Sequence, residues 1–369
     1  MLFVTLALIL AITMTSAQEE NEIEASATLD TSTSLTHNAQ IESPGIAKVT
    51  AAGNRYAAAF FNRTIRIWDT STQQLLFNIV DPTDTTLGAP GEWVAYRIYD
   101  LALNPDGSLL AASFGGHGGS IRIYDTTTGN MITELAAWSS SGDIAWKPDG
   151  TQLAARAVSG EGSRFFPHLM VWNMPTGDLV LDQEEGEPSI LNISWSPDGS
   201  QLATVDQFET VDEVYLYLTD TTTWTRELVG EFPTVVTDIT WSPDGSHIAG
   251  VDILGTVYVI NPSSGQLVWT LPGTSTSEFI RQIAWNADNK ISATDIDQIL
   301  ILDGATGFLL STVEAPRIVD VAWLPDGLLL YGGADTLTEP EVIELGTTVE
   351  TATASAPSEN ETLSHGEGR

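Results

Sequence analysis

One short motif recurs along this chain of 369 residues. In each copy an apolar run meets Pro-Asp-Gly, or a close variant of it, and a second apolar run follows. The copies are LALNPDGSLLAAS (101–113), IAWKPDGTQLAAR (144–156), ISWSPDGSQLATV (193–205), ITWSPDGSHIAGV (239–251), IAWNADNKISATD (283–295) and VAWLPDGLLLYGG (321–333), with a degenerate seventh, AKVTAAGNRYAAAF (47–60). A repeat of about 40 to 50 residues is typical of propeller blades.

The motif has a direct structural meaning. Proline presets φ for the second position of a turn, aspartate bonds nearby backbone amides, and glycine accepts the left-handed conformation that closes a hairpin. A third apolar run and a second turn follow each pair, as in SIRIYDTTTGNMITEL (120–135). Each unit therefore predicts four antiparallel strands, named a to d in chain order. The fold expected is all-β, a seven-bladed β-propeller over residues 46–346.

The strand-b to strand-c segment of the first unit, YAAAFFNRTIRIWD (56–69), ends in a Trp-Asp pair. Weaker versions of this pair are Tyr124-Asp125, Trp172-Asn173 and Leu302-Asp303. Over residues 46–346 the chain resembles the WD-repeat family, and the Pro-Asp-Gly repeat is also similar to propellers of periplasmic translocation-associated proteins. The family's Gly-His pair before strand a is missing from this chain, since Gly116-His117 falls between strands b and c. The family's hydrogen-bonded tetrad is therefore not carried over.

The two chain ends differ from the repeats. Residues 1–17 carry an apolar run and then Thr15-Ser16-Ala17, which predicts a cleaved signal peptide, with an uncleaved anchor as the alternative because no basic residue precedes the run. The expected location is therefore secreted, periplasmic or cell-surface. Residues 18–45 form an acidic, Thr-rich linker, and residues 347–369 are expected to be disordered. The fourth strand of the last blade is expected from residues 27–41, or alternatively from 349–354.

The charge balance limits the partners. The chain has 14 basic and 49 acidic residues and a net charge of −35, so nucleic acid and anionic lipid are poor partners. We expect no nucleic-acid binding and no membrane insertion once the signal is removed. Such acidity suits either a saline or an acidic environment. The chain has no cysteine, which excludes disulfides and thiolate sites.

The lengths of the connections indicate where binding takes place. The a–b and c–d turns are short and share one face, which we call the turn face. The d–a and b–c loops are longer, vary in sequence and share the other, the loop face. These loops are expected at 81–97, 114–119, 136–142, 157–168, 184–190, 206–213 and 272–280. Aromatic and arginine side chains anchor partners, so the loops predict a face that binds a protein or glycan, with the protein acting as a monomer. The candidates are Trp93, Tyr96, Arg97, Trp138, Arg164, Phe165, Phe166, His168, Phe208 and Phe279.

Two other sets of repeated residues have structural explanations. The strand-a tryptophans Trp146, Trp195, Trp241, Trp285 and Trp323 are expected to pack between blades. Asp206, Asp252 and Asp295 end strand b in successive units, which leaves open either turn caps or a shared cation site.

The chain contains no G-x-S-x-G, H-E-x-x-H, Walker or dinucleotide motif. The expectation is a non-catalytic scaffold without cofactor or metal. The alternative is a single-domain propeller hydrolase, or a metal-dependent small-molecule enzyme, acting at the central channel.

Overall fold

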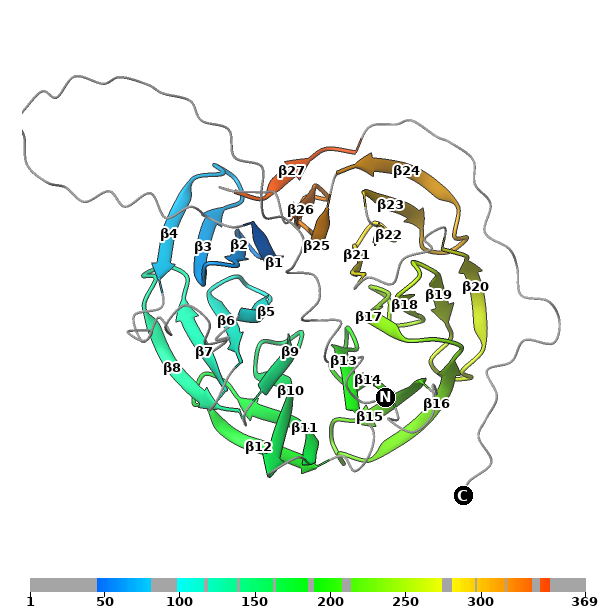
Figure 1. Ribbon diagram of the computed structural model, residues 1–369, viewed down its shortest axis with the longest axis horizontal. Helices are drawn as coiled ribbons and strands as arrows, with labels where there is room; N and C mark the ends of the chain where they lie inside the picture. Colours follow the sequence, from blue (N-terminus) through cyan, green and yellow to red (C-terminus); the bar gives the residue numbers. More distant parts are fainter. Residues whose placement is uncertain are drawn as a thin grey trace, which may run out of the picture. The chain divides into compact units, whose positions relative to one another are not determined.

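A computed structural model describes residues 45–80, 98–115, 119–137, 140–161, 164–184, 189–207, 214–273, 281–295, 297–315, 317–333 and 339–345. Over these ranges the chain forms strands grouped into seven antiparallel sheets around a ring (Figure 1). The predicted all-β, seven-bladed propeller is confirmed. None of the described residues belongs to a helix with the length and hydropathy of a membrane span.

The blades follow the chain in order, and each consists of consecutive strands. Blade 1 holds β1 (Ile46–Ala52), β2 (Arg55–Phe60), β3 (Thr64–Asp69) and β4 (Leu75–Val80), and blade 2 holds β5 (Ile98–Leu103), β6 (Leu109–Phe114), β7 (Ser120–Asp125) and β8 (Met131–Ala136). Blade 3 holds β9 (Ser140–Trp146), β10 (Gln152–Glu161), β11 (Arg164–Asn173) and β12 (Asp178–Glu184), and blade 4 holds β13 (Ser189–Trp195), β14 (Gln201–Gln207), β15 (Val214–Asp220) and β16 (Arg226–Phe232). Blade 5 holds β17 (Val236–Trp241), β18 (Ile248–Asp252), β19 (Val257–Ile260) and β20 (Leu267–Leu271), blade 6 holds β21 (Ile283–Trp285), β22 (Lys290–Asp295), β23 (Gln298–Asp303) and β24 (Leu309–Glu314), and blade 7 holds β25 (Ile318–Trp323), β26 (Leu329–Gly333) and β27 (Glu341–Ile343).

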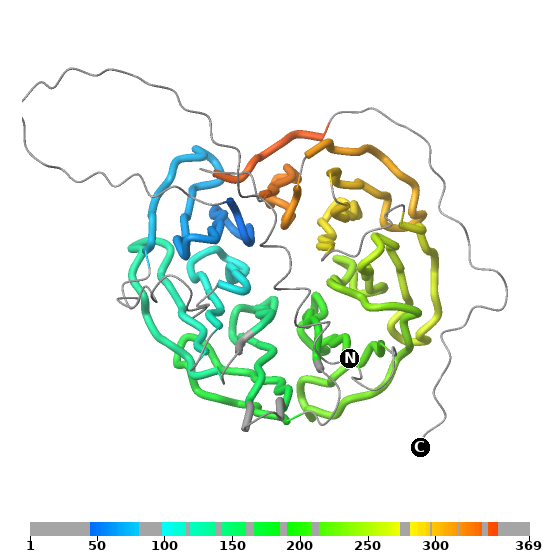
Figure 2. Tube along the Cα trace, in the orientation of Figure 1, coloured from blue at the N-terminus to red at the C-terminus, as the bar shows by residue number. Residues whose placement is uncertain are grey.

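The chain runs once around the ring, so the first and last blades become neighbours (Figure 2). Strand β1 lies against β25 and β26, and Ile46 and Val49 share one apolar cluster with Leu324 and Leu330. Blade 7 has three strands within the described residues. Both candidate segments for its fourth strand, 27–41 and 349–354, lie outside them.

The Pro-Asp-Gly turns form as their chemistry predicts. In blade 4 the Gly199 amide donates to the Ser196 carbonyl at 2.8 Å, and Gly199 has a φ of 69°. The Asp198 carboxylate accepts the Ser200 amide at 3.0 Å. The turn is therefore fixed by side chain and backbone together, which explains why the same three residues recur.

Apolar clusters between neighbouring blades form the core. One cluster unites Ile121 and Ile123 of blade 2 with Ala155 and Met170 of blade 3. The strand-a tryptophans contribute as predicted, because four of their indole nitrogens donate to a carbonyl on strand a of the preceding blade. These bonds are Trp146 to Ala102 at 2.9 Å, Trp195 to Ala145 at 3.0 Å, Trp241 to Ser194 at 3.1 Å and Trp323 to Ala284 at 3.3 Å.

The prediction of a long b–c loop at residues 157–168 is wrong. Strands β10 and β11 continue as a ladder as far as the pair Glu161 and Arg164, so this segment is a hairpin of ten-residue strands. Its glycines and serines suggested a loop, whereas Val158, Phe165 and Phe166 are residues that favour strands. Two other predicted loops are also short, since only residues 137–139 and 185–188 separate the strands there.

Candidate functional site

The ten predicted binding residues divide into two groups. Six lie outside the described residues: Trp93, Tyr96, Arg97, Trp138, Phe208 and Phe279. The other four begin strand β11, on the hairpin of blade 3: Arg164, Phe165, Phe166 and His168. Phe166 is half-buried, and His168 is only 5% exposed. The hairpin therefore brings these four positions together on the loop face, with the His168 side chain held inside the blade.

His168 joins three strands of blade 3. Its Nε2 lies 2.8 Å from the Ser159 hydroxyl on β10, and its Nδ1 lies 2.7 Å from the Asp182 carboxylate on β12. Serine, histidine and carboxylate in this order also form nucleophilic relays, but such relays need donors for an oxyanion beside the serine. Ser159 is instead part of a regular ladder, paired with Phe166. The geometry supports a brace that holds the hairpin, and this role was not predicted from the sequence.

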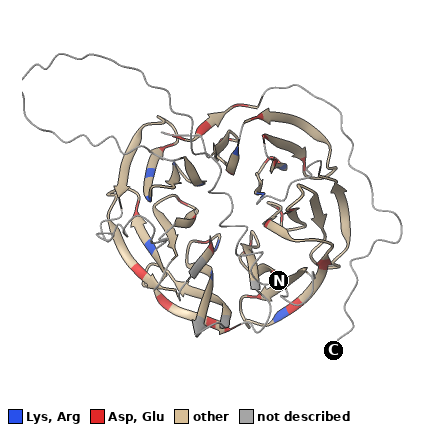
Figure 3. Cartoon of the chain, viewed as in Figure 1, with Lys and Arg blue, Asp and Glu red and all other residues tan. Residues whose placement is uncertain are grey.

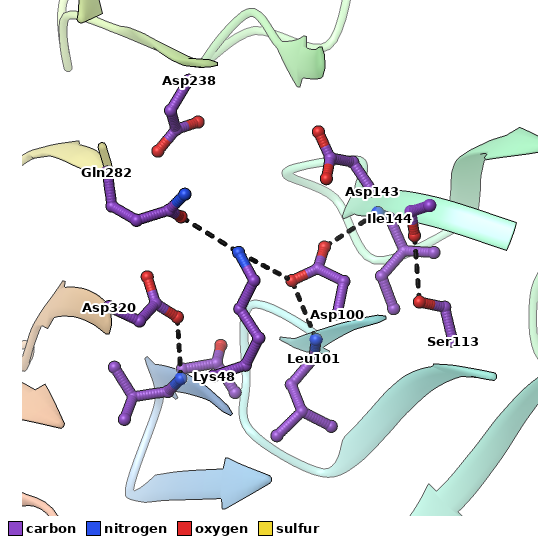
Figure 4. Close-up of polar contacts among 12 residues, drawn as sticks. Lys48, Asp100, Leu101, Ser113, Asp143, Ile144, Asp238, Gln282 and Asp320 are labelled. Carbon is purple, nitrogen blue, oxygen red and sulfur yellow. Dashed lines mark hydrogen bonds and ion pairs between the residues drawn. The ribbon is translucent and has the colours of Figure 1, made fainter. Parts of the chain in front are cut away.

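A second group of polar side chains lies at the centre of the propeller. Each blade places one residue near the start of its innermost strand, and the close-up shows how the side chains of every blade but the fourth converge (Figure 4). We call this group the channel ring. Its members are Lys48, Asp100, Asp143, Asn192, Asp238, Gln282 and Asp320.

The channel ring connects successive blades. At four of the junctions between blades, a ring side chain accepts a hydrogen bond from the next blade. The donor is the backbone amide of the residue directly after that blade's own ring residue. These bonds are Asp320 from Val49 at 2.8 Å, Asp100 from Ile144 at 2.9 Å, Asn192 from Ile239 at 3.1 Å and Asp238 from Ile283 at 2.9 Å. Each one gives an inner-strand amide a partner and holds two blades in register.

Lys48 is the one cation of the channel ring. Its ammonium donates to the Gln282 amide oxygen at 3.0 Å and lies 3.7 Å from the Asp100 carboxylate. Lys48 thereby joins blade 1 to the neighbouring blade 2 and also to blade 6, which is two blades away in the other direction. With four carboxylates and one ammonium, the ring carries more negative than positive charge when all of its groups are ionised.

Burial changes the acidity of the ring carboxyl groups. It raises the pKa of Asp238 to about 8, and the pKa values of Asp143 and Asp320 to about 6, because the charged form loses hydration. Burial also raises the pKa of Asp100. Burial opposes the charged form of Lys48, but the surrounding carboxylates, Asp320 foremost, raise its pKa well above the ordinary value. The ring thus favours a charged lysine among partly neutral carboxyl groups.

The three strand-b aspartates each have a partner within the protein. Asp206 forms an ion pair with Arg226, and Asp295 lies 3.0 Å from the Arg281 guanidinium. Asp252 accepts from the Leu254 and Thr256 amides, each at 2.8 Å. These contacts agree with the turn-cap interpretation for Asp252, and with ion pairs to arginine for Asp206 and Asp295. Within the described ranges no group of three or more His, Cys, Asp or Glu is placed to hold a metal ion.

The pKa values of aspartates on the turn face shift in the opposite direction from those of the channel ring. Hydrogen bonds from the Ser196 hydroxyl, and from the amide and hydroxyl of Ser200, lower the pKa of Asp198 to about 2. The equivalent bonds from Ser242 and Ser246 lower the pKa of Asp244 to about 2. These carboxylates are ionised caps of the a–b turns, and their bonds keep those turns short and uniform.

Seven blades around a charged centre define the molecule as a β-propeller. Residues 90–125 match the family described as WD domain, G-beta repeat, so the chain is similar to WD-repeat propellers over that repeat. The resemblance drawn from the sequence is thus confirmed by both the repeat and the fold.

Three curated relatives match part of the chain. WD repeat and SOCS box-containing protein 1 is 30% identical in Homo sapiens and 31% identical in Mus musculus, in each case over 122 residues that make up 32% of this chain and 24% of the relative. The Takifugu rubripes protein of that name is 29% identical over 128 residues, 34% of this chain and 25% of its own length. The chain therefore spans about a quarter of the length of these relatives.

Two solved structures share the fold at low identity. A chain titled Kuenenia stuttgartiensis Hydrazine Synthase has a TM-score of 0.68 at 14% identity, covering 85% of this chain and all of that one. A chain from the Crystal Structure of Mitotic Checkpoint Complex has a TM-score of 0.64 at 16% identity, covering 90% of this chain and 99% of that one. Both confirm the propeller, and neither is an argument for activity.

Proposed function

We propose that this protein is an exported, non-catalytic propeller scaffold that binds a protein or glycan partner through the d–a and b–c connections of its loop face. WD-repeat propellers typically mediate protein interactions, and residues 90–125 carry such a repeat. The proposed export rests on the signal-like residues 1–17, so the mature chain is expected to begin at Gln18.

The difference between the two faces of blade 3 carries this proposal. On the turn face, strands a and b are joined by a tight turn in which the Asp149 carboxylate accepts the Thr151 amide at 2.9 Å. On the loop face, β10 and β11 form a hairpin with ten residues in each strand, in which β10 ends at Glu161 and β11 begins at Arg164. A rigid scaffold that extends a hairpin from one face is suited to recognition on that face.

The test removes side chains from the loop face. The secreted protein, immobilised, should capture a partner from the secreted fraction of its source, and the partner is then purified for measurements of Kd. A variant with Trp93, Arg97, Arg164 and Phe165 all changed to Ala should bind at least about thirtyfold more weakly, since loss of a central anchor costs about 2 kcal/mol. Its melting temperature should stay close to that of the parent.

Ser200→Ala and Ser246→Ala, on the turn face, are the matched controls and should bind like the parent. The proposal fails if these two variants lose the partner while the loop variant retains it. It also fails if the loop variant loses its fold, because those side chains would then belong to the core.

A further inference from the structure

The outer edge of the propeller exposes apolar side chains on three consecutive blades. They are the first apolar pair of strand d in blades 1, 2 and 3, and we call them the outer rim. The pairs are Leu75 and Leu76, Met131 and Ile132, and Leu179 and Val180. Leu75, Met131 and Leu179 are 50%, 51% and 50% exposed. Single exposed apolar residues are ordinary, but a matched set on neighbouring elements marks an interaction surface.

The rim residues occupy one position of the repeat. Leu75 pairs with Trp68 on strand c, Met131 pairs with Tyr124, and Leu179 pairs with Trp172. Blade 4 places Arg226 and Glu227 at the equivalent positions. Arg226 turns inward to pair with the buried Asp206, whereas Glu227 is exposed. The fold therefore tolerates a charged residue at the second position of the pair, so the apolar residues Leu76, Ile132 and Val180 are not demanded there by the architecture.

The three pairs lie on adjoining strands. Blade 2 packs its c–d turn against blade 1, since a Cβ on Gly129 would lie 2.5 Å from the Phe77 ring on β4. Blade 3 does the same to blade 2, since a Cβ on Gly177 would lie 3.0 Å from Leu135 on β8. Figures 1 and 2 show β4, β8 and β12 following one another along the outer edge. The pairs thus lie on one continuous arc of the surface.

The charge around this arc is negative. Strands β4, β8 and β12 carry four acidic residues, Glu134, Asp178, Asp182 and Glu184, and no lysine or arginine (Figure 3). Arg122 on the neighbouring strand β7 pairs with Glu134 at 3.0 Å, which leaves the other three carboxylates in excess. A second copy of the chain would bring the same acidic strands and a net charge of −35. The terminal segments 18–44 and 346–369 are also acidic, so they are poor occupants. Complementarity favours a basic surface.

From these observations we propose that the outer rim of blades 1 to 3 docks a protein partner whose apolar side chains are flanked by lysine or arginine. Burial of the six rim side chains supplies the affinity, and the acidic residues beside them select and orient the cationic partner. This surface is separate from the loop face, so one propeller can hold two partners at once.

The test uses synthetic peptides, measured by fluorescence anisotropy. A peptide of alternating Leu and Lys should bind the parent at least about tenfold more tightly than a Ser/Lys peptide of equal charge, and a Leu/Glu peptide should not bind. Leu75→Ser, Met131→Ser and Leu179→Ser combined should reduce binding of the Leu/Lys peptide to that of the Ser/Lys peptide. Phe308→Ser, which removes a 48% exposed phenylalanine of blade 6, should leave binding unchanged.

A second variant keeps the test decisive if the triple variant folds poorly. Leu179→Thr with Val180→Thr replaces two exposed apolar residues by a polar residue that favours strands, so it should fold and bind the Leu/Lys peptide more weakly than the parent. The proposal is overturned if folded rim variants bind as the parent does, or if the Leu/Glu peptide binds equally well. Sedimentation that shows a parent dimer abolished by the rim substitutions would assign the surface to a second copy and also overturn it.

Discussion

Asp238 and Asp244 lie near opposite ends of strand β17 and face different surroundings. Asp238 belongs to the channel ring, where burial raises its pKa to about 8. Asp244 follows the strand in the Pro-Asp-Gly turn, where bonds from Ser242 and Ser246 lower its pKa to about 2. One residue type therefore serves two purposes within a single blade. In the ring it is retained at an electrostatic cost to connect blades, whereas in the turn its charge stabilises the hairpin.

The difference shows where substitution of a charged residue should destabilise a strongly acidic propeller most. Turn carboxylates are solvated and satisfied by local bonds, so their contribution is independent of the rest of the ring. The four ring carboxylates surround Lys48, and Asp143 also interacts with Arg156. Perturbation at the centre should therefore affect several blades at once, whereas perturbation of a turn should stay local.

The largest effect is expected from Lys48→Met. The substitution keeps most of the side-chain volume but removes the cation that lies among the four ring carboxyl groups and leaves Asp143 with Arg156 alone. Loss of one partner of a buried ion pair costs about 3–5 kcal/mol. Urea denaturation at pH 8 should show this loss in the free energy of unfolding.

Lys147→Met is the matched control for that measurement. Lys147 pairs with Asp149 at 3.3 Å, and the Asp149 side chain is 51% exposed, so its loss should cost no more than about 1 kcal/mol. Equal losses in the two variants would contradict the contrast between centre and surface.

A smaller effect is expected from Asp244→Ala on the turn face. The substitution removes bonds from the Ser242 hydroxyl at 2.7 Å and the Ser246 amide at 3.0 Å, which should cost about 0.5–1 kcal/mol. Because the folded pKa is lowered, this contribution is complete above the ordinary aspartate pKa and disappears only as the pH falls toward 2. The loss should be the same at pH 5 and pH 8. A loss that varied between these pH values would place Asp244 in the same electrostatic network as the ring.

The sequence contained most of the fold. The repeated Pro-Asp-Gly and the strand-a tryptophans predicted the hairpins, the number of blades and the packing between them, because both depend on local turn chemistry and a fixed side-chain period. The hairpin of blade 3 was missed because Gly160 and Ser159 are as common in loops as in strand ends. Its continuation depends on long-range pairing with β11, which composition does not reveal.

The channel ring was also missed, although a signal for it exists. Asp100, Asp143 and Asp238 each stand immediately before the apolar run of their repeat, and an alignment that begins at the apolar run leaves them out. Lys48 was harder to find, since the first repeat lacks Pro-Asp-Gly and its register follows only from the pairing of β1 with β2. That seven such positions meet at one axis is a property of ring closure rather than of any single repeat.

The most direct test of the charged centre compares the parent with Asp238→Asn across pH. Asparagine can still accept the Ile283 amide, as Asn192 accepts the Ile239 amide at the equivalent position of blade 4. In the parent the folded-state pKa of Asp238, about 8, lies above that of the unfolded chain, so the folded protein binds more protons between about pH 4 and pH 8. Stability from this group is therefore lost as the pH rises through that range.

The measurement is the difference in the free energy of unfolding, Asp238→Asn minus parent, at pH 5 and at pH 8. Our account predicts that the difference grows in favour of the variant by at least about 1 kcal/mol over this range, since each unit of pKa shift corresponds to about 1.4 kcal/mol. A difference that stays constant, or that shrinks as the pH rises, would contradict it and would place Asp238 among the ordinary solvated carboxylates.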